Sequence, residues 1–189
     1  MDQICVDGYT VIKRISSSGF SDVFLVQRTD SYFIMKTEQY ESDTLVLSNE
    51  VNILNSLPDT CCFPKIVCSG NGPAFSYFVL PLYGPSLADV VTVFRCSRIP
   101  APTATKLFHK MLAAVNALHE IGCVHCDIKP SNFLIYKNHL ILIDYGLSYI
   151  KEPQFKDQFI GTLTYASENV QRLNLPRKRD DLISCFYSA

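Results

Sequence analysis

The sequence lacks any strong bias of charge, which limits the classes of partner that it predicts. Its 17 Lys and Arg residues nearly balance its 18 Asp and Glu residues, and the formal net charge is −1. Proteins that bind nucleic acid or a membrane surface electrostatically usually carry a clear excess of positive charge. We therefore predict no nucleic acid and no membrane among its partners.

Long apolar runs, repeats and low-complexity segments are absent as well. No stretch approaches the roughly 20 apolar residues of a membrane-spanning helix. Residues 1–8 include Asp2 and Asp7 and no apolar core, so we expect no secretory signal. Hydrophobic residues nevertheless make up 48% of the 189 positions, enough for one folded domain with a substantial core.

Cysteine is present eight times, and the residues could form a zinc or redox site or could be reduced thiols without such a role. Cys123 and Cys126 form a C-x-x-C pair, which in a zinc or redox site needs a second ligand pair or a thioredoxin-like context. The sequence offers neither, so we interpret the pair as small buried residues beside a loop. Without an export signal, we expect reduced thiols in an intracellular protein, cytoplasmic, nuclear or both.

The first 81 residues predict a β-rich region. Runs of β-branched and aromatic residues alternate with turn residues, as in an antiparallel meander, and strands are expected near 9–12, 23–26, 32–36, 65–68 and 77–80. One helix interrupts them. Ser42 or Asp43 can cap this helix and Pro58 ends it. Its apolar face is formed by Leu47, Val51, Leu54 and Leu57.

After Pro81 the strand pattern gives way to helices. A short amphipathic segment covers 86–94, and a longer helix is expected to begin with Thr103 as its cap and to close at Gly122. A loop over 124–131 and short strands at 133–136 and 140–143 follow. The predicted fold class is α+β, with a lobe of five strands and one helix over 1–81, a mainly helical lobe over 82–189, and a hinge at 82–84.

Three polar clusters interrupt the apolar pattern, and the first consists of Lys36 and Glu50. Lys36 ends a predicted strand and Glu50 lies on the following helix. A lone Lys there is more often a solvated charge, but a Lys oriented by an inward Glu can hold the α- and β-phosphates of a nucleotide.

The other clusters lie in the second lobe. In the loop His125–Asn132, Asp127 can accept the proton of an attacking hydroxyl, Lys129 can neutralise a transferring phosphoryl group, and Asn132 can bind a divalent metal. Asp144 follows a buried strand, and its carboxylate can bind Mg²⁺. A polar surface loop would explain any one cluster. Their order and spacing together match the protein-kinase signature set.

Several stretches resemble the casein kinase I group of protein kinases, including its tau-tubulin kinase relatives. They are Gly84–Leu87, His125–Phe133, Gly161–Thr162 with Tyr165–Ser167, and Arg179–Leu182. The resemblance covers essentially the whole chain and is most specific in the second lobe. It implies a two-lobed protein-kinase-like fold with an incomplete C-terminal lobe, and an ATP-dependent serine/threonine protein kinase that uses Mg²⁺.

The resemblance also implies roles for single residues. Thr162 would lie beside the catalytic Asp127, Asp181 would hold the backbone of its loop, and Asn132 and Asp144 would bind the metal. The implied nucleotide contacts are Ile15, Ser16, Ser18, Gly19, Val23, Ile34, Lys36, Glu50, the gatekeeper Leu80 and Leu82. The basic group 177–179 would read acidic or phosphorylated residues near the target Ser or Thr, unless it is only a solvated loop.

Two departures from the family pattern concern single positions. Ser16, Ser18 and Ser21 replace the three glycines of the nucleotide loop. Because glycine lets backbone approach phosphate closely, we expect weak ATP binding, unless the serine hydroxyls donate hydrogen bonds instead. Cys126 replaces the Arg that pairs with a phosphate on the activation segment in many kinases, so we expect no switching by that modification.

A third departure is that the chain ends within the segment that resembles the central helix of the large lobe. We therefore expect Phe186 and Tyr187 to be exposed. The departures support an alternative to the active kinase, a pseudokinase or protein-interaction module with weak or no ATP turnover. Phosphate transfer to a small molecule is disfavoured, because the position of Lys129 resembles that in Ser/Thr protein kinases.

Overall fold

The computed structural model describes residues 5–18, 21–40, 46–93, 99–151 and 158–188. The chain divides into two compact units, one formed by Met1–Asn55 and Pro64–Leu82, the other by Ser56–Phe63 and Tyr83–Ala189. The predicted boundary after residue 81 lies within one residue of this division. Residues 56–63 differ from the prediction, because they group with the second unit, where the Cys62 carbonyl accepts a hydrogen bond from Leu142 N at 2.9 Å.

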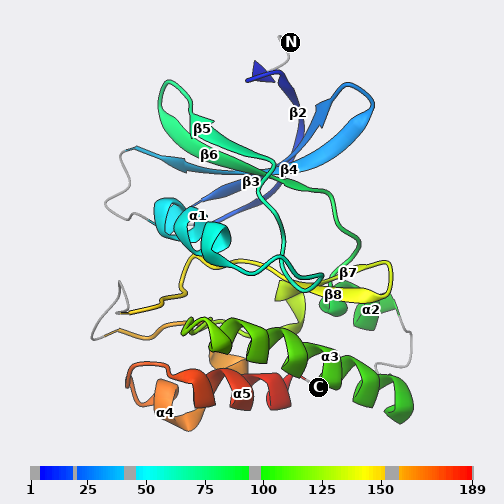
Figure 1. The fold of residues 1–189 in the computed structure, drawn as a ribbon, viewed down its shortest axis with the longest axis vertical. Helices are drawn as coiled ribbons and strands as arrows, with labels where there is room; N and C mark the ends of the chain where they lie inside the picture. Colours follow the sequence, from blue (N-terminus) through cyan, green and yellow to red (C-terminus); the bar gives the residue numbers. More distant parts are fainter. Residues whose placement is uncertain (1–4, 19–20, 41–45, 94–98, 152–157, 189) are drawn as a thin grey trace. The chain divides into compact units, whose positions relative to one another are not determined.

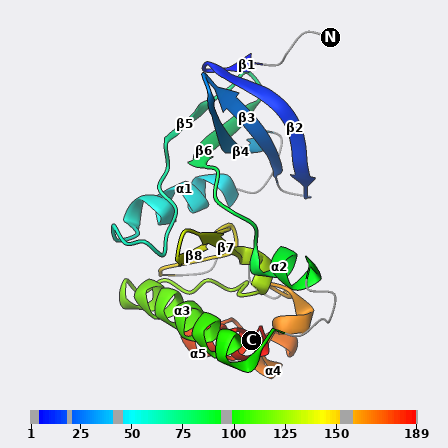
Figure 2. The same ribbon diagram turned by 90° about the vertical axis from the view of Figure 1, so that its right-hand side faces the viewer.

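The first unit is built on an antiparallel sheet (Figure 1). Its strands are β1 Cys5–Val6, β2 Tyr9–Ser17, β3 Asp22–Arg28, β4 Ser31–Gln39, β5 Cys68–Asn71 and β6 Phe75–Pro81, in the order β1-β2-β3-β4-β6-β5. The predicted meander is confirmed. The prediction missed the two-residue β1, which pairs with β2 (Figure 2), and β5 begins at Cys68, where the predicted strand was expected to end.

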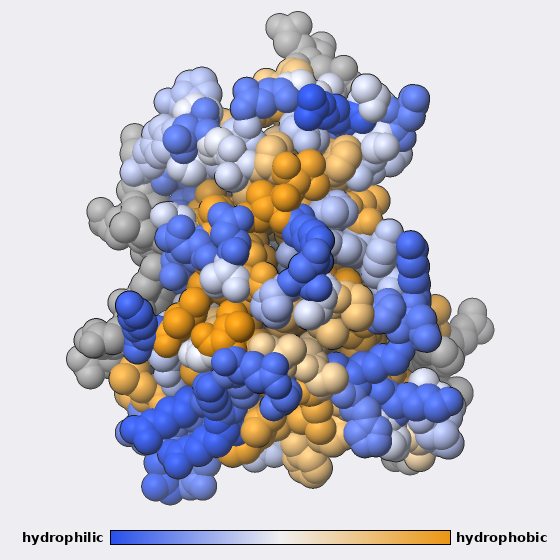
Figure 3. Space-filling view, viewed as in Figure 1, coloured by the Kyte–Doolittle hydropathy of each residue, from blue (hydrophilic) through white to orange (hydrophobic). Residues whose placement is uncertain are grey.

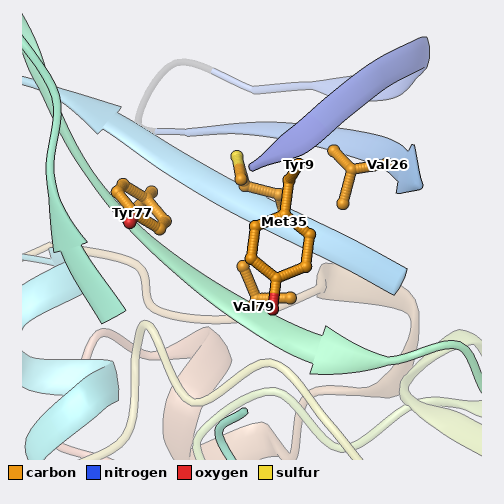
Figure 4. Close-up of a cluster of buried hydrophobic side chains, with 5 residues drawn as sticks. All are labelled: Tyr9, Val26, Met35, Tyr77 and Val79. Carbon is orange, nitrogen blue, oxygen red and sulfur yellow. The ribbon is translucent and has the colours of Figure 1, made fainter. Parts of the chain in front are cut away.

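The two faces of this sheet carry different side chains. Tyr9, Val26, Met35, Tyr77 and Val79 form one buried hydrophobic cluster, shown in Figure 4. Side chains alternate between faces along a strand, and directly paired residues share a face. Met35 pairs with Val79, so the neighbouring pairs Ile34–Leu80 and Lys36–Phe78 lie on the opposite face. Val23 joins that face because it pairs with Lys36.

Helix α1, Val46–Ser56, confirms the predicted helix between the third and fourth predicted strands. It ends one residue before Leu57 and two before Pro58. The candidate caps Ser42 and Asp43 lie outside the described residues. The structure adds a partner from the sheet instead, because the buried Glu38 carboxylate accepts a hydrogen bond from Leu47 N at 2.8 Å, satisfying one of the open amides of the first helical turn.

The second unit contains helices and one short pair of strands. Its helices are α2 Leu87–Val93, α3 Ala101–Glu120, α4 Glu168–Gln171 and α5 Lys178–Tyr187, with 3₁₀ turns η1 Pro130–Asn132 and η2 Leu163–Tyr165. Strands β7 Phe133–Tyr136 and β8 His139–Leu142 pair antiparallel. Helices α3 and α5 lie side by side in both views (Figures 1 and 2). The predicted strands at 133–136 and 140–143 are therefore confirmed to within a residue.

The start of α3 differs from the prediction. The helix begins at Ala101 after Pro100, and Thr103 lies in its first turn, where its amide donates to Pro100 O at 2.8 Å. Thr103 is therefore not the cap. Pro102 sits at the second helical position, where its missing N–H costs nothing. The predicted end is right, because Gly122 has the positive φ of +81° that suits a residue just beyond a helix.

The surface mixes hydrophobic and hydrophilic side chains, as the face in Figure 3 shows. Phe186 and Tyr187 on α5 are exposed, as expected. No helix in the described ranges has both the length and the apolar composition needed to cross a membrane.

Candidate active site

Lys36 and Glu50 form an ion pair within the first unit. Lys36 Nζ lies 2.7 Å from Glu50 Oε2, and the two side chains are 13% and 3% exposed. Strand β4 supplies the Lys and α1 supplies the Glu. Because water is largely excluded, the carboxylate fixes the position of the ammonium group more firmly than a surface pair would. The pairing expected from the sequence is therefore confirmed, and the ammonium is fixed on the same face as Val23 and Ile34.

Other predicted nucleotide contacts lie near this pair on the sheet. Val23, Ile34 and Leu80 are half-buried and share its face. Ile15 and Leu82 are exposed and are accessible to a ligand. Ser16 and Ser18 lie at and just beyond the end of β2, whereas Gly19 lies outside the described residues.

In the second unit, Asp127 is the centre of a compact polar group. Its side chain is 8% exposed. Lys129 Nζ donates to Asp127 Oδ2 at 2.6 Å, and Thr162 Oγ1 donates to Asp127 Oδ1 at 2.7 Å. Lys129 Nζ also donates to Thr162 Oγ1 at 3.0 Å. The structure therefore brings Asp127, Lys129 and Thr162 together, with an anionic oxygen pair fixed between an ammonium and a hydroxyl.

Thr162 reaches Asp127 because the preceding residue has no side chain. Gly161 has a φ of +101°, and a Cβ added there would lie 2.4 Å from the carbonyl oxygen of Cys126. Cys126 itself has a φ of +71°, which is uncommon for a residue with a side chain and often marks a functional loop. The backbones of Gly161 and Cys126, both at positive φ, thus pack against each other beside Asp127.

The predicted metal ligands Asn132 and Asp144 flank one pair of strands. Asn132 comes directly before β7, and Asp144 follows β8 after one residue. Because the strands are antiparallel and Phe133 pairs with Leu142, both ligands lie at the same end of this hairpin. Ile143 N donates to Asn132 O at 3.0 Å and fixes the two loops to each other.

The donor set fits a hard divalent cation. The Asn132 amide nitrogen donates to Asp127 O at 2.9 Å, and among the described residues the hydrogen bonds of this side chain all use that nitrogen. Its amide oxygen is not used by these bonds and could serve as a ligand at the end of the hairpin where Asp144 also lies. Mg²⁺ prefers such oxygens and takes only one or two protein carboxylates, with phosphate and water completing its shell.

Buried polar residues hold the Asp127 loop from α5 and α3. Asp181 accepts hydrogen bonds from His125 N at 2.8 Å and from Cys126 N at 3.0 Å, which confirms the expected contact with the loop backbone. His119 Nε2 lies 2.8 Å from the same carboxylate. Sequence reasoning missed His119, because its partner is 62 residues away.

The His125 side chain connects the backbone of Asp127 to that of Ile143. Its Nδ1 accepts from Asp127 N at 3.3 Å, so Nε2 carries the hydrogen that Ile143 O accepts at 3.1 Å. Its ring also packs edge-on against Tyr145, with centroids 5.2 Å apart. The imidazole therefore links the residue before Asp144 to the backbone of Asp127.

Cys126 brings no charge to the site. Its side chain packs with Val124 and Ile160 in an apolar cluster. Burial, followed by the charge of Asp181, raises the pKa of its thiol far above the ordinary value. The group therefore stays a neutral thiol where many kinases have an Arg.

Comparison with known proteins places these residues in a family context. The model of the protein kinase domain matches residues 9–185. A "probable serine/threonine-protein kinase" of Dictyostelium discoideum is 30% identical over 95% of this chain and 39% of its own length. A "probable casein kinase I homolog" of Encephalitozoon cuniculi is 31% identical, with shares of 95% and 60%.

The serine/threonine-protein kinase spe-6 of Caenorhabditis elegans is 27% identical over 95% of this chain and 51% of its own length. The chain thus spans about half the length of the curated relatives that it matches.

Proposed function

Because this chain belongs to the protein kinase domain family, we propose that it is a serine/threonine protein kinase of casein kinase I type, which transfers the γ-phosphate of ATP to a Ser or Thr hydroxyl. The observation that carries the proposal is the arrangement at Asp127. Its carboxylate is nearly buried and is fixed by Lys129 at 2.6 Å and Thr162 at 2.7 Å, beside two candidate metal ligands.

In this mechanism each residue has a separate task. Asp127 orients the acceptor hydroxyl and takes its proton, and Lys129 stabilises negative charge that develops on the transferred group. Lys36, held by Glu50, binds the α- and β-phosphates, while Asn132 and Asp144 hold Mg²⁺. Bound Mg²⁺ would neutralise phosphate charge. Thr162 keeps the Asp127 carboxylate in place for the acceptor.

The finer assignment rests on motifs and on surface charge. The residues His125–Phe133 and the similarity to the casein kinase I homolog support the casein kinase I type. Arg177, Lys178 and Arg179 are exposed at the start of α5. A cluster of cations favours acidic or phosphorylated residues near the target Ser or Thr, and we propose such proteins as substrates.

A pseudokinase is the second candidate, and one observation favours it. The serines of the nucleotide loop form hydrogen bonds with each other, Ser18 Oγ donating to Ser21 O at 3.0 Å. Such a loop offers fewer free donors to phosphate, so weak nucleotide binding with little or no turnover is the alternative outcome.

The first test separates binding from turnover. Thermal melting of the whole 189-residue chain is followed while MgATP is added, because a ligand that binds only the folded state raises the melting temperature. Phosphate transfer to an acidic Ser/Thr peptide is measured in parallel. We expect Asp127→Asn to reduce turnover by about 100- to 10,000-fold while the MgATP shift is kept.

Asp144→Asn should abolish the Mg²⁺-dependent part of the shift. Asp30→Asn, at an exposed turn, is the matched control and should change neither readout. Turnover retained in Asp127→Asn would refute the assignment of the base. A cooperative melt with no shift at millimolar MgATP would refute the kinase proposal and favour the pseudokinase.

A further inference from the structure

The loop between β2 and β3 is closed by hydrogen bonds between Ser18 and Ser21. Ser18 Oγ donates to Ser21 O at 3.0 Å and accepts from Ser21 N at 3.1 Å. Ser18 N also donates to Ser21 O at 2.9 Å. The two hydroxyl oxygens lie 3.4 Å apart. We call this group the Ser18–Ser21 clasp.

The clasp directly follows the paired part of strands β2 and β3. Ser16 pairs with Val23 and Ser17 pairs with Asp22, so the β2–β3 ladder continues to the residue before the clasp. A register shift between Arg14 and Ser16 sets a bulge one step further back, and bulges redirect the end of a strand. The Ser18–Ser21 clasp therefore lies at the end of the β2–β3 ladder, next to the pair formed by Ser17 and Asp22.

The clasp uses the groups that such a loop offers to a phosphate. Backbone N–H groups in a turn form an anion-binding concavity, provided that they are not already bonded. Here Ser21 N is bonded to the Ser18 hydroxyl and Ser18 N to a carbonyl. A phosphate that approaches Ser21 N must first displace the Ser18 hydroxyl, and glycine at position 18 would impose no such requirement.

We propose that the Ser18 hydroxyl is a built-in competitor of the nucleotide phosphates, which lowers the affinity of this chain for phosphate-bearing nucleotides and not for the nucleoside part. The inference rests on the proposed nucleotide binding and deepens it. Ser18 is then a residue that determines ligand specificity, because ATP has to open the clasp and adenosine does not.

The proposal predicts that removing the Ser18 hydroxyl makes MgATP bind more tightly. Ser18→Ala removes the competing hydroxyl, leaves the Ser18 N to Ser21 O bond, and frees Ser21 N. One exposed hydrogen bond corresponds to about a five-fold change in an equilibrium constant. We expect Ser18→Ala to bind MgATP about five-fold more tightly than the unchanged chain, and to bind adenosine equally well. If the hydroxyl contacted phosphate directly, the same change would weaken MgATP binding.

The experiment compares dissociation constants for MgATP and for adenosine, by calorimetry or thermal shift, in the unchanged chain, Ser18→Ala and Ser17→Ala. Ser17 is exposed at the end of β2, next to Ser18, and forms no part of the clasp, so Ser17→Ala should leave both constants unchanged. A selective gain for MgATP in Ser18→Ala supports the inference.

The other outcomes distinguish a failure of this inference from a failure of the proposed kinase function. Unchanged or weaker MgATP binding in Ser18→Ala, with adenosine still bound, overturns the clasp as a competitor but leaves the proposed kinase function standing. An equal change for both ligands assigns Ser18 only a structural role and also overturns it. If none of the chains binds either ligand, the proposed nucleotide binding itself is wrong, and the inference is lost with it.

Discussion

The backbone at Gly161 lies so close to the Asp127 loop that no side chain fits there. Its φ of +101° and the 2.4 Å approach of a built Cβ to Cys126 O are two separate reasons for glycine. The second matters for chemistry, because Cys126 precedes Asp127 and Thr162 follows Gly161. Any movement that relieves the clash must separate Thr162 from Asp127.

We therefore predict that Gly161→Ala reduces kcat by at least about ten-fold, the effect of misplacing one catalytic contact, with little change in KM for ATP. Steady-state kinetics with varied MgATP would measure both. Gly122→Ala is the matched control, because Gly122 also has a positive φ, +81°, but nothing lies within 4 Å of its Cβ. It should lose about 1–2 kcal/mol of stability, the cost of a Cβ in the left-handed region, and keep kcat. Equal kcat values in the two variants would contradict the argument.

Single residues differ in how well the sequence predicts them. The pairing of Lys36 with Glu50 could be predicted, because Lys36 lies at the end of a predicted strand and Glu50 lies on the helix that follows it. Glu38 could not, because nothing in its neighbourhood shows that it binds the first turn of α1. Ser18 was expected only to hinder or to bind phosphate, whereas its bonds to Ser21 depend on the exact turn.

Helix α5 contacts the backbone of the Asp127 loop through Asp181. Its carboxylate is 2% exposed and accepts from the amides of His125 and Cys126 and contacts His119 Nε2. Three groups from α3 and the Asp127 loop thus depend on one side chain. A buried carboxylate with several donors stabilises a loop only as long as all of its acceptor sites remain.

Asp181→Asn should therefore be costly, although it preserves shape. The amide nitrogen cannot accept a hydrogen bond, so at least one buried N–H loses its partner, at a cost of about 1–3 kcal/mol. Urea unfolding would measure the loss, and kcat should fall with it because the Asp127 loop is less well held.

The matched control is Glu168→Gln on α4. Glu168 forms one exposed pair with Arg172 at 2.5 Å, and such i,i+4 pairs contribute only about 0.3–0.5 kcal/mol. If Asp181→Asn cost no more than Glu168→Gln, the idea that α5 supports the loop through this carboxylate would be wrong.

Elements were predicted more reliably than their ends. The strands β2, β3, β4 and β6 and the helices α1 and α3 follow from periodicity, because burial of one face imposes it. The start of α3 was misplaced, since Pro100 and Pro102 outweigh a capping Thr in fixing the first turn. The strand β1 has only two residues, too few for any pattern, and β5 contains Gly70 and polar residues that weaken its signal.

Across the second unit, three of the described cysteines, Cys123, Cys126 and Cys185, are buried, and their burial predicts a dependence of stability on pH. Burial, helped by the charge of Asp181, raises the pKa of Cys123 and of Cys185 from 9.0 to about 12, and raises that of Cys126 as well. The folded chain thus keeps these protons at a pH where the unfolded chain releases them. Their contribution to stability is complete below about pH 9 and is lost as pH rises toward 12.

The size of the effect follows from proton linkage. Each such thiol should lower the free energy of unfolding by up to about 1.4 kcal/mol per pH unit above its unfolded pKa. Urea unfolding at several pH values between about 8 and 10.5 would give the slope. Tyrosines and lysines also titrate in this range, so the informative quantity is the difference between variants.

Cys123→Ala removes one buried thiol and should reduce the slope by about 1 kcal/mol per pH unit, even though the cavity it leaves lowers stability at neutral pH. Cys5→Ala removes an exposed thiol on β1 instead and is the matched control, because it leaves the three buried thiols in place; its slope should stay that of the unchanged chain. Equal slopes in the two variants would mean that Cys123 is accessible to water in the folded chain. In that case α3, the Asp127 loop and α5 would not form the closed core from which the arrangement of Asp127, Lys129 and Thr162 is argued.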